Sequence, residues 1–272
     1  MATADAALLI AIISAAITAG GLLWQLLLYH LSGSRLEVRL SPVLVDERAV
    51  IMEGPESGWK TGPPSFPEPI GPWVIDLAHV RVTNIGRTPV SVSDISLDFG
   101  RRRWFRPRSR IRMSGFPVSV LKGREETAVR LDAGESTSNY FDIWPLIEEA
   151  RKWKHGALTV RASAEPAARR PKRSRWRRRW RIPPDAKTLR TPDDAPPANE
   201  LQAFHAVWRQ LRIDPDAFAL LEVIWRVIQP KLSTAATSAD LTDELERQPF
   251  PDDRYHALVS FAAFQAYHGE GD

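Results

Sequence analysis

The feature that most constrains this chain is an apolar run near its N-terminus. Residues 6–31, AALLIAIISAAITAGGLLWQLLLYHL, contain no Asp, Glu, Lys or Arg. As a helix this run would be about 39 Å long, which exceeds the roughly 30 Å hydrocarbon core of a bilayer. A cleaved signal peptide would need a basic start and a shorter apolar core, whereas the chain begins MATADA. The sequence therefore predicts an uncleaved, single-pass transmembrane anchor over residues 1–34.

The flanks of this run predict its orientation. Arg35 and Arg39 follow the run and no basic residue precedes it, which favours a cytoplasmic C-terminal side. Trp24 and Tyr29 lie toward the same end, where amphipathic rings prefer the headgroup region. Small residues at four-residue spacing are compatible with a homodimer of this helix, although alanine is common in such helices; they are Ala11, Ala15, Ala19, Ala16 and Gly20.

After the run, the hydrophobic period changes from helical to two. Residues 36–40, LEVRL, alternate apolar and charged side chains, as a half-buried strand does. Residues 80–82 and 90–92 continue the pattern, and residues 95–99 follow with the opposite phase, which predicts a bulge near positions 93–94. Further short strands are expected at residues 117–121, 127–131, 137–141 and 158–162.

Two turns in this region carry a resemblance to a known class of domain. VTNIGRTPVSVSDISL, residues 82–97, is followed by LDAGES at 131–136 and then by an aromatic strand. This arrangement resembles the immunoglobulin-like modules of bacterial proteins, over roughly residues 36–182. The resemblance implies an all-β sandwich, which we place at residues 35–182, and it implies no catalytic residue.

Three further segments complete the expected organisation. Residues 54–72 form a long loop rich in proline and glycine, whose Trp59 and Phe66 are expected to pack on the sandwich. Residues 142–156 are expected to form a short helix. Residues 183–198 hold five prolines and predict a linker. Residues 199–272 then predict an acidic, all-α module, or helices that pack back on the sandwich, with helices at 199–211, 215–228, 237–247 and 253–268.

The chain carries no recognisable catalytic signature. It lacks cysteine, which excludes thiolate metal sites and thiol catalysis, and it lacks the glycine-rich nucleotide motifs, GxSxG and HExxH. Its histidines show no metal-ligand spacing, and His79 is expected at the surface or at a sheet edge. The sequence therefore predicts a protein that is not an enzyme and has no cofactor and no metal.

Two arginine-rich segments are the strongest signal for a partner. RRPKRSRWRRRWR, residues 169–181, has nine Lys or Arg among thirteen residues, and GRRRWFRPRSRIR, residues 100–112, has seven arginines. If residues 175–182 form a strand, one side carries Trp176, Arg178, Trp180 and Ile182, and the other carries Arg175, Arg177, Arg179 and Arg181. The first side would face the core, with the tryptophans and the isoleucine buried or half-buried. The candidate residues for an anionic surface are Arg101, Arg102, Arg103, Arg106, Arg108, Arg110, Arg173, Arg175, Arg177, Arg179 and Arg181. The interfacial aromatics are Trp24, Tyr29, Trp104, Trp176 and Trp180.

Three anionic partners compete for these arginines. Anionic lipid at the inner membrane surface would attract each basic side chain with roughly 1 kcal/mol. Nucleic acid could bind through its phosphates, with tryptophan stacking on bases. The third is the chain's own tail, since residues 193–272 hold 14 acidic and 6 basic groups, a net of −8, whereas residues 169–192 hold 11 basic and 1 acidic, a net of +10.

The sequence as a whole favours a membrane-anchored, non-enzymatic interaction protein. Its arginine-rich sandwich would contact anionic lipid or a protein partner at the cytoplasmic membrane surface. A membrane tether for nucleic acid is the alternative, and so is an envelope-facing binding module if the orientation is reversed. These are expectations about placement and charge, because a sandwich fold does not define an activity.

Overall fold

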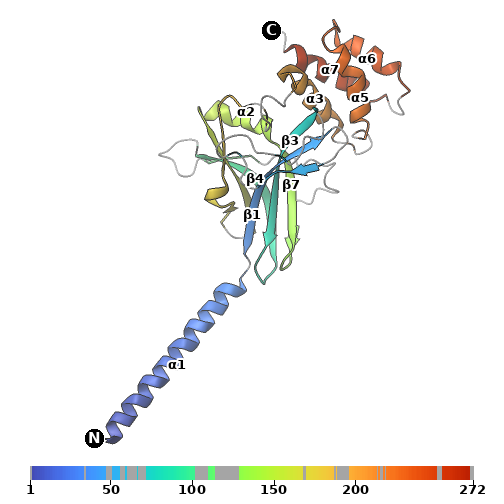
Figure 1. Ribbon diagram of the computed structural model, residues 1–272. Helices are drawn as coiled ribbons and strands as arrows, with labels where there is room; N and C mark the ends of the chain where they lie inside the picture. Colours follow the sequence, from blue (N-terminus) through green and yellow to red (C-terminus); the bar gives the residue numbers. More distant parts are fainter. Residues whose placement is uncertain are drawn as a thin grey trace.

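Two antiparallel sheets form the body of the molecule (Figure 1). The first sheet has the order β2-β1-β3-β7; the second has the order β10-β8-β4-β5, with β6 pairing β4 and β9 pairing β8. The strands are β1 Leu36–Asp46, β2 Ile51–Glu53, β3 Val74–Asn84, β4 Val90–Arg101, β5 Arg110–Met113, β6 Val129–Leu131, β7 Ser136–Asp142, β8 Leu158–Pro166, β9 Lys172–Arg173 and β10 Trp180–Ile182. This computed structural model describes residues 2–33, 35–46, 51–55, 59, 66, 72–101, 110–113, 129–167, 170–186, 188, 196–212, 214, 217, 219–249 and 253–269.

Both sheets contribute to one hydrophobic core, because alternate residues of each strand face the other sheet. Val38 and Leu40 of β1 and Val80 of β3 meet Leu97 of β4 and Val160 of β8 in this cluster. Each of these side chains is buried. The result is a β-rich body compatible with a β-sandwich, in which the period of two seen in the sequence is confirmed.

Two local predictions for the strands are also confirmed. The register of β4 against β8 shifts between Val92 and Asp94, which is the bulge that the change of phase predicted. The turn after β3 is organised by buried Asn84: its Nδ2 donates to the carbonyl of Thr88 at 2.9 Å, and its Oδ1 accepts from the backbone N of Gly86 at 3.0 Å. The Asn84 side chain thus provides hydrogen-bond partners for backbone groups of the turn, as buried backbone groups require.

The C-terminal helices pack on the outer face of the first sheet. They are α3 Ala198–Leu211, α5 Leu221–Ile228, α6 Ser238–Glu246 and α7 His256–His268. Their buried residues, such as Phe204 and Trp225, share a second core with the outward-facing Val43 of β1 and with Ile75 and Leu77 of β3. Figure 1 shows these helices at the end of the sheets opposite to α1.

The expected helix between the strands is found where it was predicted, and so is the packing of the two aromatics of the long loop. Helix α2, Ile143–Trp153, buries Ile143, Ile147 and Ala150. Trp59 is only 5% exposed and Phe66 packs beside the same core, so the aromatics of the long loop lie on the sandwich as expected. The strand expected at residues 117–121 lies outside the described residues, and so do residue 187 and residues 189–195 of the expected linker.

The fold class predicted from the sequence is wrong in its transmembrane helix. Helix α1, Ala2–Ser32, forms over the apolar run, but within the described part of the chain no helix is long and apolar enough to cross a membrane. Ser14, Thr18 and Gln25 place polar side chains among the apolar residues of this helix. The described chain has a mixed architecture of two sheets and six α-helices, in place of a transmembrane helix, an all-β domain and a small all-α module.

Candidate functional site

The second arginine-rich segment does not form the continuous strand that its alternation predicted. It divides into β9, a turn of 3-10 helix, η2 Trp176–Arg178, and β10. The backbone N of Arg178 donates to the carbonyl of Arg175 at 2.9 Å and closes this turn. Because a 3-10 turn breaks the period of two, Trp176 is 58% exposed whereas Trp180 is fully buried. The prediction that both tryptophans face the core is therefore wrong for Trp176.

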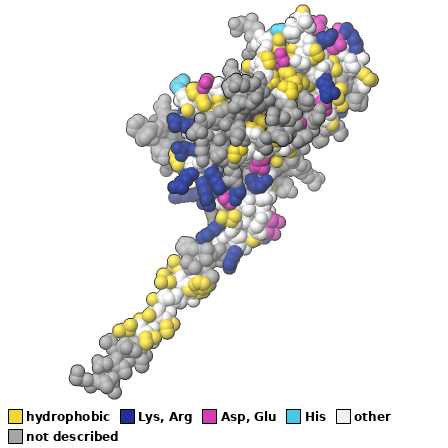
Figure 2. Space-filling view, in the orientation of Figure 1, with side chains coloured by type: hydrophobic (Ala, Val, Ile, Leu, Met, Phe, Trp, Pro, Cys, Tyr) yellow, Lys and Arg dark blue, Asp and Glu magenta, His cyan; other side chains and the backbone are white. Residues whose placement is uncertain are grey.

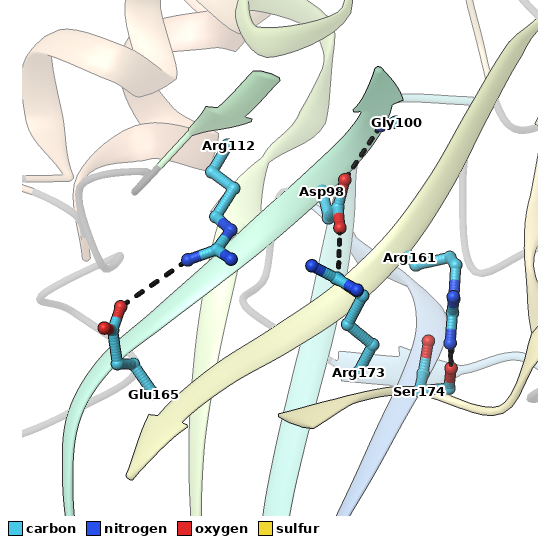
Figure 3. A network of polar contacts seen from close by, with 7 residues as sticks. All are labelled: Asp98, Gly100, Arg112, Arg161, Glu165, Arg173 and Ser174. Carbon is cyan, nitrogen blue, oxygen red and sulfur yellow. Dashed lines mark hydrogen bonds and ion pairs between the residues drawn. The ribbon is translucent and has the colours of Figure 1, made fainter. Parts of the chain in front are cut away.

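Internal polar contacts fix the start of this segment to the outer face of the second sheet (Figure 3). Nε of Arg173 lies 2.6 Å from Oδ2 of Asp98, a fully buried carboxylate on β4. The other oxygen of Asp98 accepts from the backbone N of Gly100 at 2.8 Å. Arg161 of β8 donates through Nε and Nη2 to the carbonyl of Ser174, with the Nε contact at 3.0 Å. These contacts neutralise the buried carboxylate of Asp98 and determine which arginines are turned inward.

The end of the segment is fixed by the core and by the long loop. Trp180 and Ile182 are fully buried in the sandwich, and the backbone N of Arg181 donates to the carbonyl of Trp59 at 2.6 Å. Residues 174–179 therefore form a short bridge between two anchored strands. Since both ends are fixed, the outward side chains of this bridge have a defined position on the surface.

The outward side chains of the bridge form a basic surface, which we call the arginine platform. Arg175, Arg177 and Arg181 are exposed, while Arg178 and Arg179 are half-buried. Figure 2 shows Lys and Arg side chains gathered on one side of the sandwich, between the C-terminal helices and α1. The arginine platform consists of Arg175, Trp176, Arg177, Arg178, Arg179 and Arg181.

Trp176 is in contact with two guanidinium groups. The guanidinium carbon of Arg179 lies 4.2 Å from the centre of the Trp176 ring, and that of Arg161 lies 5.4 Å away. Cation–π contacts at these distances stabilise a cation by about 0.5–1 kcal/mol at exposed sites. Nη1 of Arg179 also donates to the carbonyl of Trp176 at 3.2 Å, so this arginine is held at two points.

The arginine platform is close to Glu37 at the start of β1, which begins at Leu36, shortly after α1 ends at Ser32. The hydrogen bond from Arg39, 3.0 Å between Nη2 and Oε2, is the largest cause of the lowered pKa of Glu37. Burial opposes this shift, and the charges of Arg39, Arg175 and Arg178 add to it. The basic surface is therefore near the end of the sandwich from which α1 extends.

The other predicted site residues have different positions. Arg101 and Arg110 are paired across β4 and β5, with their side chains outside the described set, whereas Arg102, Arg103, Trp104, Arg106 and Arg108 lie outside the described residues altogether. On α1, Trp24 is 61% exposed, and the side chain of Tyr29 is not among those described. Arg173 forms the internal pair with Asp98 and is not part of the platform. All residues of the platform come from the second arginine-rich segment.

Sequence reasoning missed two arginines of this region. Arg161 contacts Trp176 from β8, and its outward position could have been found from the alternation in LTVRASA, residues 158–164. Arg178 was expected to face the core with Trp176, because a continuous strand was assumed.

A further ion pair lies on the same face of the second sheet. Nη1 of Arg112 on β5 lies 3.6 Å from Oε2 of Glu165 on β8 (Figure 3).

A second polar cluster lies on the outer face of the first sheet. Nδ1 of His79 is 3.1 Å from Oε1 of Glu53, which also accepts a short hydrogen bond from Ser41. His79 stacks on Tyr140, with ring centres 4.5 Å apart, and is only 2% exposed. The expectation that His79 lies at the surface is wrong, because the neighbouring side chains cover it. Within the described part of the chain, no group of three or more potential ligands could hold a metal ion.

The tail carboxylates that form described ion pairs use nearby cations. Glu222 pairs with Arg226 on α5, and Glu244 of α6 pairs with Arg247 and Lys231. In the ion pair between the tail and the sandwich, the tail supplies the cation and the sandwich supplies the anion. Nε of Arg209 on α3 lies 2.6 Å from Oδ2 of Asp142 at the end of β7. These contacts give no support to an acidic tail that covers the arginine platform.

The comparisons with known proteins identify no relative. No protein-family model, no curated protein and no solved structure matches the chain. The resemblance to immunoglobulin-like modules therefore gains no independent support.

Proposed function

We propose that this chain is a non-enzymatic interaction protein that binds an anionic lipid surface through the arginine platform. The observation that carries the proposal is the fixed position of the platform. Two anchored strands hold an exposed tryptophan among outward-facing arginines. These arginines project outward and concentrate positive charge at one place on the surface. Such a concentration of charge attracts a polyanion.

The magnitude of the attraction supports binding to a charged membrane surface. A basic side chain close to anionic lipid contributes roughly 1 kcal/mol, so five platform arginines could contribute up to about 5 kcal/mol. Trp176 favours lipid over a purely electrostatic partner, because an exposed indole prefers the interface between headgroups and acyl chains. Its ring is exposed beside the arginines that would contact the headgroups.

The neighbouring surface of α1 also favours lipid over nucleic acid. Large apolar side chains of α1 are exposed, among them Ile17 at 71% and Leu23 at 69%. A patch of this kind marks an interaction site. A lipid surface can satisfy apolar and anionic contacts together, whereas a nucleic acid offers phosphates and bases without an apolar phase. Nucleic-acid binding remains the alternative, since tryptophan can stack on unpaired bases.

The proposal is tested by vesicle binding. The full chain would be sedimented with vesicles of phosphatidylcholine alone or mixed with phosphatidylglycerol, at low and high salt. We expect anionic vesicles to bind more tightly at low salt, because the exposed charges are screened as ionic strength rises. The triple variant R175Q/R177Q/R181Q should lose roughly two orders of magnitude of this affinity, at about 1 kcal/mol for each arginine.

A matched control separates the platform from net charge. The variant R226Q/K231Q/R247Q removes the same three positive charges from α5 and the adjacent helices, where the side chains are 64%, 50% and 67% exposed. It should bind anionic vesicles like the unaltered chain. Equal losses in the two variants would mean that only net charge matters. Tighter binding of a single-stranded oligonucleotide, with displacement of the vesicles, would favour the alternative function.

A further inference from the structure

We propose that Arg161, Trp176 and Arg179 form a binding site for a phosphomonoester headgroup of an anionic lipid. This inference rests on the proposed function and names the ligand of the same surface. The three residues are brought together from two parts of the chain: Arg161 comes from the middle of β8, and the other two come from the bridge between β9 and β10. The site is therefore a product of the fold.

The two guanidinium groups at Trp176 are oriented by more than the ring. Arg161 donates through Nε and Nη2 to the carbonyl of Ser174, and Ser174 itself is only 1% exposed. Arg179 donates through Nη1 to the carbonyl of Trp176. Each guanidinium thus has one fixed backbone acceptor and one contact with the indole. A guanidinium held in this way has already lost much of the rotational freedom that a free surface arginine loses on binding.

The chemistry of an oriented guanidinium selects the ligand. Arginine offers five N–H donors in a planar fork that matches phosphate oxygens in pairs, and the described contact of Arg179 uses one nitrogen. A guanidinium that lies over an indole ring can still donate in its own plane to an anion. A phosphomonoester has three terminal oxygens and a charge of about −1.5 to −2 at neutral pH, whereas a phosphodiester offers two terminal oxygens and a single charge. The former can accept from both arginines at once.

The inference is tested by comparing two lipids at equal surface charge. Full-length protein would be titrated with phosphatidylcholine vesicles that contain either phosphatidic acid, a phosphomonoester, or enough phosphatidylglycerol, a phosphodiester, to give the same zeta potential. We expect about tenfold tighter binding to phosphatidic acid, the effect of roughly one additional charge-assisted hydrogen bond. Soluble glycerol 3-phosphate should reduce this difference while leaving the binding to phosphatidylglycerol in place.

Two variants test whether the preference depends on Arg179 and Trp176. Arg179→Lys keeps the charge but removes the planar fork, and Trp176→Leu removes the ring at an exposed position. Arg179→Lys should bind both vesicles at the level that the unaltered chain shows for phosphatidylglycerol. Trp176→Leu should bind the two vesicles equally but below that level, because it also loses the interfacial contact of the indole. Arg226→Lys makes the same exchange at a 64% exposed position of α5, outside the platform, and should retain the preference.

The outcomes separate this inference from the proposed function. Equal binding of the unaltered chain to both lipids would overturn the phosphomonoester site and leave anionic-surface binding intact. A preference that survives in Arg179→Lys and Trp176→Leu would also overturn the site, because it would then have another origin. Binding to neither anionic vesicle above the level for phosphatidylcholine alone would overturn the proposed function itself.

Discussion

Asp98 and Arg173 form an internal ion pair between two strands of the second sheet. The carboxylate is fully buried, the guanidinium is 27% exposed, and 2.6 Å separates Oδ2 from Nε. The pair explains how a segment with nine basic residues can lie against a folded domain. One arginine is directed inward and neutralises a buried carboxylate, and Asp98 in turn fixes the strand from which the remaining arginines project outward.

Removing the cation of this pair should destabilise the fold. Arg173→Gln removes the positive charge that neutralises the buried Asp98. Loss of one charge costs about 3–5 kcal/mol in fully buried pairs; we expect roughly 2–3 kcal/mol here, since Arg173 is partly exposed. Urea unfolding of the full chain would measure this loss. Arg177→Gln, on an exposed residue of the same segment, should change the free energy of unfolding by less than about 0.5 kcal/mol. Similar losses in both variants would contradict an internal role for Arg173.

The buried hydrogen bond from Trp144 to Asp76 should stabilise the junction of α2 with the first sheet. Nε1 of Trp144 donates to Oδ2 of Asp76 at 2.9 Å, and the two residues are 5% and 1% exposed. Trp144→Phe keeps an aromatic ring but removes the donor, so we expect a loss of about 1–3 kcal/mol. Trp153→Phe, at a 45% exposed position of the same helix, is the matched control. Equal unfolding midpoints for the Trp144 and Trp153 variants would show that this hydrogen bond contributes little.

Strands and helices could be predicted from this sequence because their hydrophobic periods are regular. Residues 36–40 and 80–82 alternate cleanly, and the change of phase after Val92 gave the position of the bulge. The helical period around Phe204 and Trp208 gave α3. The sequence could not show that these helices cover Val43 and Leu77, because both strands are apolar on two faces at that end.

The candidate site was only partly predictable, because it depends on long-range contacts. The arginines of residues 169–181 were identified from composition, but the direction of each side chain was assigned from strand alternation. The pair of Arg173 with Asp98 and the contact of Arg161 with Trp176 join residues 75 and 15 positions apart. Such contacts leave no periodic signal in the sequence. They decide that Trp176 is outside and Trp180 inside.

Gly54 lies where a side chain would collide with the long loop. A Cβ at this position would be 2.9 Å from both Cε1 of Phe66 and Cγ of Pro42, closer than such atoms approach in folded proteins. The backbone N of Gly54 donates to the carbonyl of Pro42 at 2.7 Å, so this strand end cannot withdraw easily. We expect Gly54→Ala to cost about 1–3 kcal/mol of unfolding free energy, as overpacking does. Gly134 is unsuitable as a control, because its φ of +83° makes any substitution strained.

The cost of Gly54→Ala should depend on Phe66. Phe66→Leu shortens one of the two colliding side chains, so the double variant should lose less than the sum of the two single losses. A double-mutant cycle in urea measures this coupling. Strict additivity would mean that the strain comes from the Pro42 side of Gly54 alone.

His205 makes the contact between α3 and the first sheet sensitive to pH. It is 7% exposed, and one ring nitrogen, Nε2, lies 3.2 Å from the carbonyl oxygen of Val74. Burial lowers the pKa of His205 below its ordinary value of 6.5, and this outweighs the attraction of Asp76 and Asp142; Arg209 lowers the pKa further. The folded chain therefore binds this proton less readily than the unfolded chain does.

Acidification should consequently destabilise the fold through His205. The contribution is absent above about pH 6.5, grows as the pH falls below the unfolded pKa, and levels off below the lowered folded pKa. His205→Gln, which has no proton to gain, should flatten the pH dependence of the urea midpoint between about pH 7.5 and 5.5. His155→Gln, at an exposed position after α2, should retain the dependence of the unaltered chain. If His205→Gln loses stability on acidification as steeply as the unaltered chain, another group carries the effect.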